Sequence, residues 1–202
     1  MSNQPHEHAG WASPAPAGLT ALAVACFTFF AVLTGRVPGT TAPLLGCWLI
    51  GGFVVQLVVG LVELKEGHLL GGNVFLFFSA FFMLAGGLEF LVKASGDFAA
   101  FGVTSEIDGW AWLVLLITLI LWTPAYLKTS TAVLGITVLF LDVAVLFVTL
   151  RDLAILPSAT AGPIAGWAIG GGGVLAIYHA AALQLNTAWG KTILPLGTSI
   201  LK

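Results

Sequence analysis

The sequence predicts an all-α integral membrane protein built as a six-transmembrane-helix bundle. Of its 202 residues, 58% are hydrophobic and only 8% are charged. The mean hydropathy is +1.03, and no water-soluble domain of this size needs so little charge. The apolar runs are too long for the strands of an outer-membrane barrel and lack period-two alternation. Helices therefore remain as the structure that satisfies every backbone group in lipid.

Six stretches reach the roughly 20 mostly apolar residues that a membrane span requires. We expect spans at about residues 17–35, 42–63, 71–92, 110–127, 131–150 and 163–186. They form a single domain, residues 13–197, which is followed by a C-terminal tail of residues 198–202. Residues 1–12 precede it, and we expect them to form a flexible N-terminal tail.

The first span starts after a serine and two prolines. Ser13 can cap the helix, and Pro14 and Pro16 suit the first turn, where a proline removes no hydrogen bond that the helix could have made. The first basic residue, Arg36, comes only after the apolar run. A secretory signal carries its positive charge before that run, so we expect this helix to be retained as a span.

The links between the spans predict the topology. The short links at 36–41 and 127–130 make the helices on either side antiparallel neighbours, and the longer, acidic link at 93–108 is typical of a solvated loop. If the N-terminus is cytoplasmic, the cytoplasmic side carries four basic residues, Lys65, Lys128, Lys191 and Lys202. The outer side then carries three, Arg36, Lys93 and Arg151. This small excess favours cytoplasmic termini in the cytoplasmic (inner) membrane.

Several classes of protein are excluded by the charge pattern and by missing motifs. The 7 basic and 9 acidic residues are scattered singly, so we expect no nucleic-acid partner. Cys26 and Cys47 lie in apolar runs, which indicates small buried hydrophobes. The sequence has no zinc-protease motif, phosphate loop or nucleophile elbow. We therefore expect no enzymatic activity, no metal and no cofactor.

Ionisable residues at membrane depth are costly and are therefore functional candidates. Glu89, Asp142 and His179 lie within spans, and we consider them as a proton relay. For Asp142, which lies at mid-span, the alternative is a neutral or paired carboxyl at a helix or subunit interface. For His179, the alternative is a haem ligand with His68 as the second imidazole.

The middle of the spans holds no lysine or arginine. An anion that crosses here must be met by helix N-termini, hydroxyl groups and amides such as Gln56 and Asn73, or it must cross protonated. Five phenylalanines crowd residues 75–82. Aromatic rings can form a constriction that gates by dewetting, although most of these five must pack in the core or face lipid.

Three separated motifs, in order, resemble those of a known family. "SPAPAGL" (13–19) is similar to an N-P-A-P-L-G-L signature, and "GGFVVQLVVGLVELKEG" (51–67) resembles G-G-x-x-Q-x-x-x-G-x-x-E-[FY]-x-x-G. Residues 166–197 are similar to a terminal G-W…A-I-Y…L-N…G-[RK]-T-x-L-P-x-G segment. Together they resemble the acetate uptake transporter family over nearly the whole chain.

The resemblance implies a homohexamer of six-helix protomers in the lipid bilayer. Each protomer would have its own pathway for acetate, related short monocarboxylates or succinate, in channel-like or proton-coupled transport. The substrate pathway carried over from the motifs comprises Ser13, Pro14, Pro16, Gly18, Gln56, Glu63 and Asn73. The family's hydrophobic gate falls at Leu22, Phe78 and Phe140.

The chain departs from the family pattern at several of these positions. Ser13 replaces the signature asparagine, Ala17 its leucine, and His68 a further asparagine. Phe78 stands where a tyrosine is usual, which removes a hydroxyl from the gate. Two other classes of function are open. One is a non-transporting membrane subunit that scaffolds or stabilises a larger complex. The other is a membrane redox subunit, which would show a haem absorbance band.

Overall fold

The computed structural model describes residues 11–95 and 105–202. The helical elements are α1 (Ala15–Leu33), the 3-10 turn η1 (Gly39–Thr41), α2 (Ala42–Lys65), α3 (Leu69–Phe78), the π-helical turn η2 (Ser79–Leu84), α4 (Ala85–Ala94), α6 (Glu106–Thr129), α7 (Ala132–Asp152) and α8 (Ser158–Trp189). Since α3, η2 and α4 run on without a break, the described residues contain six helices long and apolar enough to cross a membrane. The predicted fold class is confirmed.

Most of the helices extend beyond the apolar runs that predict them, although α1 ends at Leu33, two residues earlier than expected. The difference is largest for the last span, where α8 starts at Ser158, more than one turn before Pro163. Pro163 therefore lies inside the helix, where its nitrogen cannot donate to the carbonyl four residues earlier. Hydropathy marks where a span enters lipid, whereas the backbone continues its hydrogen-bond ladder past that level.

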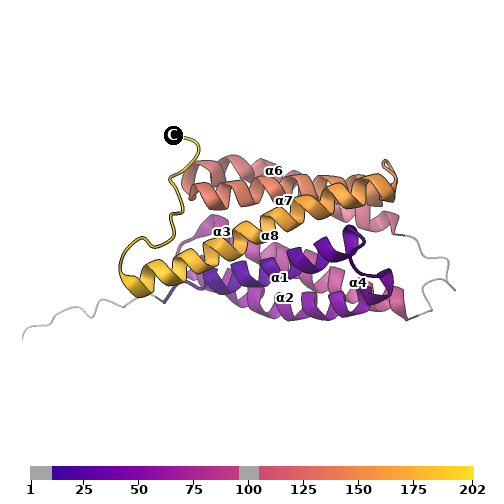
Figure 1. The fold of residues 1–202 in the computed structure, drawn as a ribbon, viewed down its shortest axis with the longest axis horizontal. Helices are drawn as coiled ribbons and strands as arrows, with labels where there is room; N and C mark the ends of the chain where they lie inside the picture. The colour runs from indigo at the N-terminus through magenta and orange to yellow at the C-terminus, as the bar shows by residue number, and fades with distance from the viewer. Residues whose placement is uncertain (1–10, 96–104) are drawn as a thin grey trace, which may run out of the picture.

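The spans form a ring in which each helix packs on the next. α1 contacts α2, α2 contacts α3 and α4, α6 contacts α7, α7 contacts α8, and α8 returns to α1. Figure 1 shows all of them running along the long axis of the molecule.

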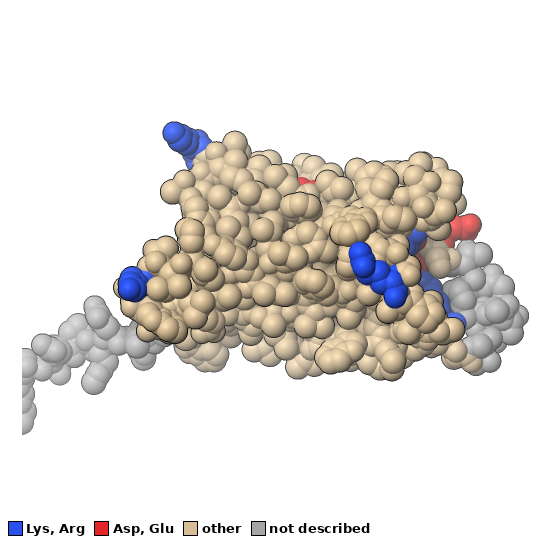
Figure 2. Space-filling model, viewed as in Figure 1, with Lys and Arg blue, Asp and Glu red and all other residues tan. Residues whose placement is uncertain are grey.

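Charged side chains gather at the two ends of the ring. Most of the visible flank in Figure 2 is tan; most blue and red residues lie toward the ends, and one small red patch lies near the middle of the upper edge. One end, which we call the termini end, holds the start of α1 and the ends of α2, α6 and α8. The opposite end, which we call the far end, holds the end of α4 and the start of α6. Exposed apolar side chains cover the flank between them, among them Trp48, Trp110 and Trp167.

Side chains close the ring between α3 and α6, where backbone contacts are few. The rings of Phe77 and Trp122 meet edge to face with their centroids 5.3 Å apart. The Tyr126 hydroxyl donates to the backbone carbonyl of Leu70 over 3.2 Å. This join depends on bulky side chains, whereas small residues let the other helices approach closely.

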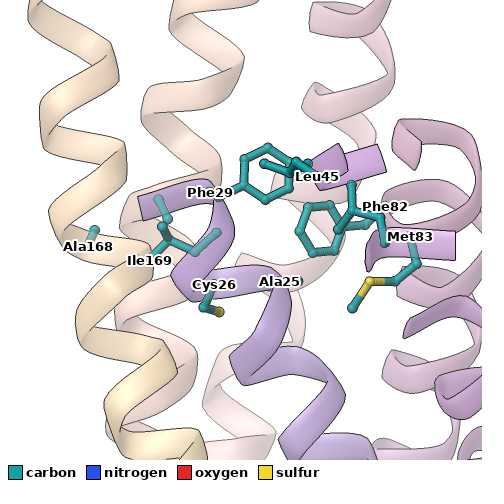
Figure 3. Close-up of a cluster of buried hydrophobic side chains, with 10 residues drawn as sticks. Ala25, Cys26, Phe29, Leu45, Phe82, Met83, Ala168 and Ile169 are labelled. Atoms are coloured by element: carbon teal, nitrogen blue, oxygen red, sulfur yellow. The ribbon is translucent and has the colours of Figure 1, made fainter. Parts of the chain in front are cut away.

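The main apolar core lies where α1, α2, η2 and α8 meet. Figure 3 shows its side chains pointing toward one another from these elements, with the Phe29 and Phe82 rings at the centre. These two rings stack with centroids 5.3 Å apart. Around them lie Ala25, Cys26, Leu45, Leu49, Met83, Ala144, Ala168 and Ile169.

Two glycines allow α2 and α4 to touch backbone to backbone. A Cβ atom added at Gly46 would lie 2.6 Å from the carbonyl oxygen of Gly87, and one added at Gly87 would lie 2.9 Å from the carbonyl oxygen of Gly46. No side chain can be inserted here without moving a helix. Small residues permit this kind of close crossing in membrane bundles.

The first described residues are fixed against the end of α2. The backbone N–H of Trp11 donates to Glu66 Oε1 over 3.1 Å, and Lys65 Nζ lies 4.0 Å from the centroid of the Trp11 ring. Trp11 is therefore anchored, although the sequence indicated a flexible tail up to residue 12. The rest of that tail, residues 1–10, and the loop residues 96–104 lie outside the described residues.

The C-terminal segment crosses the termini end of the bundle. α8 ends at Trp189, and its C-cap residue, Gly190, has a left-handed φ of +62°, which suits a glycine. The residues that follow turn back toward α6 and α7, as the yellow trace in Figure 1 shows. Backbone hydrogen bonds hold them there, from Val133 N–H to Leu196 O (3.1 Å) and from Leu201 N–H to Leu127 O (2.9 Å). The segment that includes the predicted tail, residues 198–202, is thus packed on the bundle.

A single methyl group tests the α2–α4 crossing. We expect Gly46→Ala to lower the melting temperature of the purified protein by about 3–10 °C, because overpacking costs about 1–3 kcal/mol. Gly51→Ala, in the same helix, is the control, because a Cβ there meets nothing within 4 Å and alanine favours helix. Equal melting temperatures for the two variants would contradict the crossing.

Candidate functional site

A cavity of about 330 Å³ opens inside the ring at the termini end. We call it the mouth cavity. Its walls are mostly apolar, and no lysine or arginine is among the described residues that line it. Its ionisable and amide side chains are Gln56, Glu63, His68, Tyr126 and His179. These come from α2, the α2–α3 link, α6 and α8, which the ring brings together.

Glu63 is the carboxylate of the mouth cavity, and it is buried. Its Oε2 lies 2.8 Å from Nδ1 of His68, and its Oε1 accepts from the Ser13 hydroxyl over 3.4 Å. The Ser13 oxygen in turn accepts from the backbone N–H of Ala15 over 3.3 Å. Ser13 thus links the start of α1 to a carboxylate, which the positive end of a helix favours. The positive end of α1 therefore already faces a carboxylate of the protein itself.

Gln56 and His179 are deeply buried residues of the mouth cavity, and each carries a polar side-chain atom without a partner in the described part of the chain. Gln56 is 1% exposed and His179 is 5% exposed. Oε1 of Gln56 and Nδ1 of His179 have no hydrogen-bond partner among the described residues. A buried polar atom without a partner costs about 1–3 kcal/mol, so both side chains retain hydrogen-bonding capacity that the protein itself does not use.

Three apolar side chains separate the mouth cavity from a second, smaller one. Leu22, Phe78 and Leu141 line both cavities, and we call these three residues the neck. The small cavity has about 30 Å³ and a wholly apolar lining, enough space for about two water molecules. Without polar partners water does not stay in such a space, which is the condition for a dewetted constriction.

The expected third gate residue differs from the one found in the neck. Phe140 packs its ring toward Gly171, where an added Cβ would lie 2.6 Å from Cε1 of Phe140, and Phe140 is 37% exposed. It lines neither the mouth cavity nor the small cavity. A shift of one residue along a helix turns a side chain by about 100°, so the inward position belongs to Leu141.

A third cavity, of about 540 Å³, opens at the far end. It shares Phe29, Leu33, Trp112 and Val148 with the small cavity. We call it the far cavity, and its outer wall is charged. Lys93 Nζ donates to Asp108 Oδ2 over 2.7 Å and to Glu89 Oε2 over 3.5 Å. Arg151 Nε donates to Asp152 Oδ1 over 2.6 Å. Three cavities therefore follow one another through the ring.

The structure brings together one part of the pathway expected from the sequence. The expected residues that line the mouth cavity are Ser13, Leu22, Gln56, Glu63, Phe78 and His179. Four residues of the expected substrate pathway, Pro14, Pro16, Gly18 and Asn73, lie outside it. Pro16 faces an outer groove between α1, α2 and α8, Asn73 Nδ2 donates to the Leu69 carbonyl of its own helix over 2.8 Å, and Pro14 precedes α1 as its N-cap.

Gly18, the fourth of these residues, has a packing role. A Cβ added there would lie 2.7 Å from Phe75 and 2.9 Å from Val59. The missing side chain lets α1 approach α2 and α3. Gly18 thereby positions Phe75, which lines the mouth cavity.

The three candidate relay residues lie in three separate places. Glu89 lines the far cavity, and His179 lines the mouth cavity. Asp142 lines neither, and its Oδ2 lies 2.7 Å from the Thr123 hydroxyl between α7 and α6. The described residues therefore form no continuous chain of these three groups, and the placement of Asp142 agrees with a carboxyl at a helix interface.

Two residues that line the site, Leu141 and Tyr126, are not predicted by the sequence. Leu141 has no motif near it, and in a helix that is apolar on every side hydropathy cannot separate an inward leucine from an outward one. Tyr126 lines the mouth cavity and is 3% exposed. Its signal was a lone tyrosine near the end of an apolar run, which is also typical of a membrane-interface residue.

The ring and its cavities define a class, a multi-pass helical membrane protein with three cavities in series along its axis. The chain belongs to the GPR1/FUN34/yaaH family, whose profile matches residues 1–194, and this confirms the resemblance to acetate transporters found in the sequence. Among solved structures it is similar to that of the bacterial acetate channel SatP, with a TM-score of 0.73 and 22% identity over 93% of this chain and 99% of that chain. A comparison with curated proteins finds no match.

Cysteine accessibility tests the mouth cavity independently of any transport. Leu134 lines the cavity, whereas Leu139, in the same helix, is 41% exposed on the outer surface. With Cys26 and Cys47 replaced by alanine, we expect Leu134→Cys in liposomes to react at least about tenfold faster than Leu139→Cys with a small hydrophilic thiol reagent, because the reactive thiolate needs water. Similar rates at both positions would mean that the cavity is not hydrated.

Proposed function

We propose that this protein transports acetate and related small carboxylates across the membrane through the centre of its helix ring. The observation that carries the proposal is the neck, where Leu22, Phe78 and Leu141 separate two cavities inside the ring. Membership of the GPR1/FUN34/yaaH family and the fold shared with a bacterial acetate channel support it.

The neck imposes a condition on the form in which the substrate passes. A bare carboxylate in a dry apolar space costs several kcal/mol, whereas a protonated acid costs far less. The substrate therefore crosses either as the acid, which couples flux to protons, or through a neck that opens and hydrates, as in a channel. Flux measured with and without a pH gradient separates the two modes.

We infer a homohexamer in the cytoplasmic membrane, with both termini in the cytoplasm. The hexamer is what the family resemblance implies. The orientation follows from four lysines at the termini end, Lys65, Lys128, Lys191 and Lys202, against Arg36, Lys93 and Arg151 at the far end. The alternative, a non-transporting subunit of a larger complex, has no need of cavities in series through its own ring.

Uptake into proteoliposomes tests the transport proposal directly. We expect radiolabelled acetate to enter vesicles that contain the purified protein faster than it enters empty vesicles of the same lipid. Empty vesicles are essential because acetic acid also permeates bilayers unaided. Equal rates with and without protein would refute transport and favour the scaffold alternative.

Truncation of the neck tests which residues form the gate. We expect Leu22→Ala, Phe78→Ala and Leu141→Ala each to raise acetate flux by roughly threefold or more, because a wider neck hydrates more readily. Phe140→Ala is the matched control, since this ring lies outside both cavities. If Phe140→Ala raised flux while Leu141→Ala did not, the neck assigned here would be wrong.

A further inference from the structure

We propose that Gln56 and His179 form a carboxyl-binding subsite at the edge of the neck. It would select monocarboxylates with a short apolar tail over dicarboxylates. The inference deepens the proposed function and rests on it. Gln56 on α2 and His179 on α8 line the same cavity. The carboxyl group of the substrate would bind to these two residues rather than at the helix N-terminus near Ser13.

Packing contacts place Gln56 at the depth of the neck. α1 and α2 are antiparallel, and a Cβ added at Gly18 would lie 2.9 Å from Cγ1 of Val59. Gln56 lies three residues before Val59, which corresponds to a step of about 4.5 Å along the axis. That step leads to about residue 21 of α1, beside Leu22.

The same reasoning places His179 at this depth from the other side of α1. α8 is antiparallel to α1, and a Cβ added at Gly173 would lie 2.7 Å from Cβ of Cys26. Six residues further along α8, His179 falls beside about residue 20 of α1. Gln56 and His179 thus occupy one level of the mouth cavity, next to Leu22.

The free hydrogen-bonding capacity of this pair matches a carboxyl group. A glutamine amide offers donors and an acceptor, and an imidazole can offer one of each. Both side chains are more than nine-tenths buried, and each has an atom without a partner in the described structure. The unpartnered Oε1 of Gln56 is an acceptor, which the O–H of a protonated carboxyl group can satisfy, and Nδ1 of His179 can donate to the carbonyl oxygen of the same group in the tautomer that carries its proton there. This pairing requires no full positive charge at this depth.

The remaining wall of the mouth cavity suits an apolar tail. Leu19 belongs to a buried apolar cluster against which Phe75, Leu134 and Leu183 pack, and all four line the cavity. The volume of about 330 Å³ lies in the range of small-molecule sites, so the cavity has room for more than two carbons. Each added methylene should therefore strengthen binding until the space is filled.

The charges around the cavity disfavour a second carboxylate. No lysine or arginine is found among its described lining residues, and Glu63 is the carboxylate already present. A dicarboxylate would have to place its second charge either against this carboxylate or on apolar wall, and both are costly. The family resemblance extends to succinate, so this inference separates the chain from that expectation.

Equilibrium dialysis with the purified protein in detergent tests the subsite. Radiolabelled butyrate is the probe, and unlabelled acetate, propionate and succinate are competitors. We expect saturable binding that strengthens about three- to fourfold per methylene from acetate to butyrate, with succinate the weakest competitor. Stronger competition by succinate than by acetate would overturn the proposed selectivity.

Variants of matched shape test the residues. His179→Phe keeps a ring without nitrogen, and Gln56→Met keeps the length without the amide, so we expect each to weaken butyrate binding about tenfold. His179→Asn retains a polar atom at the position of Nδ1, and we expect it to recover most of the affinity. Unchanged affinity in His179→Phe and Gln56→Met would overturn the subsite and leave the two residues with structural roles.

Measurements of butyrate binding and of acetate flux together distinguish a failure of the subsite from a failure of transport. If the expected binding pattern occurs but vesicles show no protein-dependent uptake, the transport proposal fails and the subsite stands. If uptake occurs and His179→Phe has the half-saturating concentration of the parent protein, transport stands and the subsite fails. A higher half-saturating concentration in this variant, with a similar maximal rate, supports both.

Discussion

A charge in the apolar interior of a helix bundle is costly unless it is paired, and the layout of this protein follows from that constraint. Lys93 and Arg151 are paired with carboxylates at the far end. Glu63, the carboxylate of the mouth cavity, contacts His68 and Ser13. Between the ends, the lining of the neck and the small cavity carries no charge. The series of cavities is therefore polar at both openings and apolar in the middle.

Close backbone packing holds some helix pairs of the ring together, and bulky side chains hold others. Gly46 and Gly87 bring α2 and α4 into contact, and similar small residues line other crossings. Between α3 and α6, by contrast, aromatic rings fill the gap. The π-helical turn η2 follows Phe78 directly, and such turns often occur at functional sites. It changes the register between Phe78, at the neck, and Phe82, in the core below it.

Hydropathy and motif spacing predict the six spans and two neck residues, Leu22 and Phe78, since the motifs near them fix the register. No motif fixes the register of α7, and Phe140, the residue expected from the family frame, lies outside both cavities, whereas its neighbour Leu141 lines them. Hydropathy also cannot reveal contacts that form across the fold. The hydrogen bond that anchors Trp11 depends on the position of the end of α2, which the sequence around residue 11 does not contain.

The C-terminal segment has a mechanical consequence for the ring. Through the hydrogen bonds of Leu196 and Leu201, it connects the end of α8 to the α6–α7 pair. The other neighbour of this pair in the ring is α3, which makes few backbone contacts with α6. The α6–α7 pair is thus joined to α3 mainly by side chains, and to α8 by helix packing and by the backbone hydrogen bonds of the C-terminal segment. Any movement of α6 and α7 away from α8 would have to break the backbone hydrogen bonds of Leu196 and Leu201 as well as the α7–α8 packing, whereas few backbone contacts hold α6 to α3.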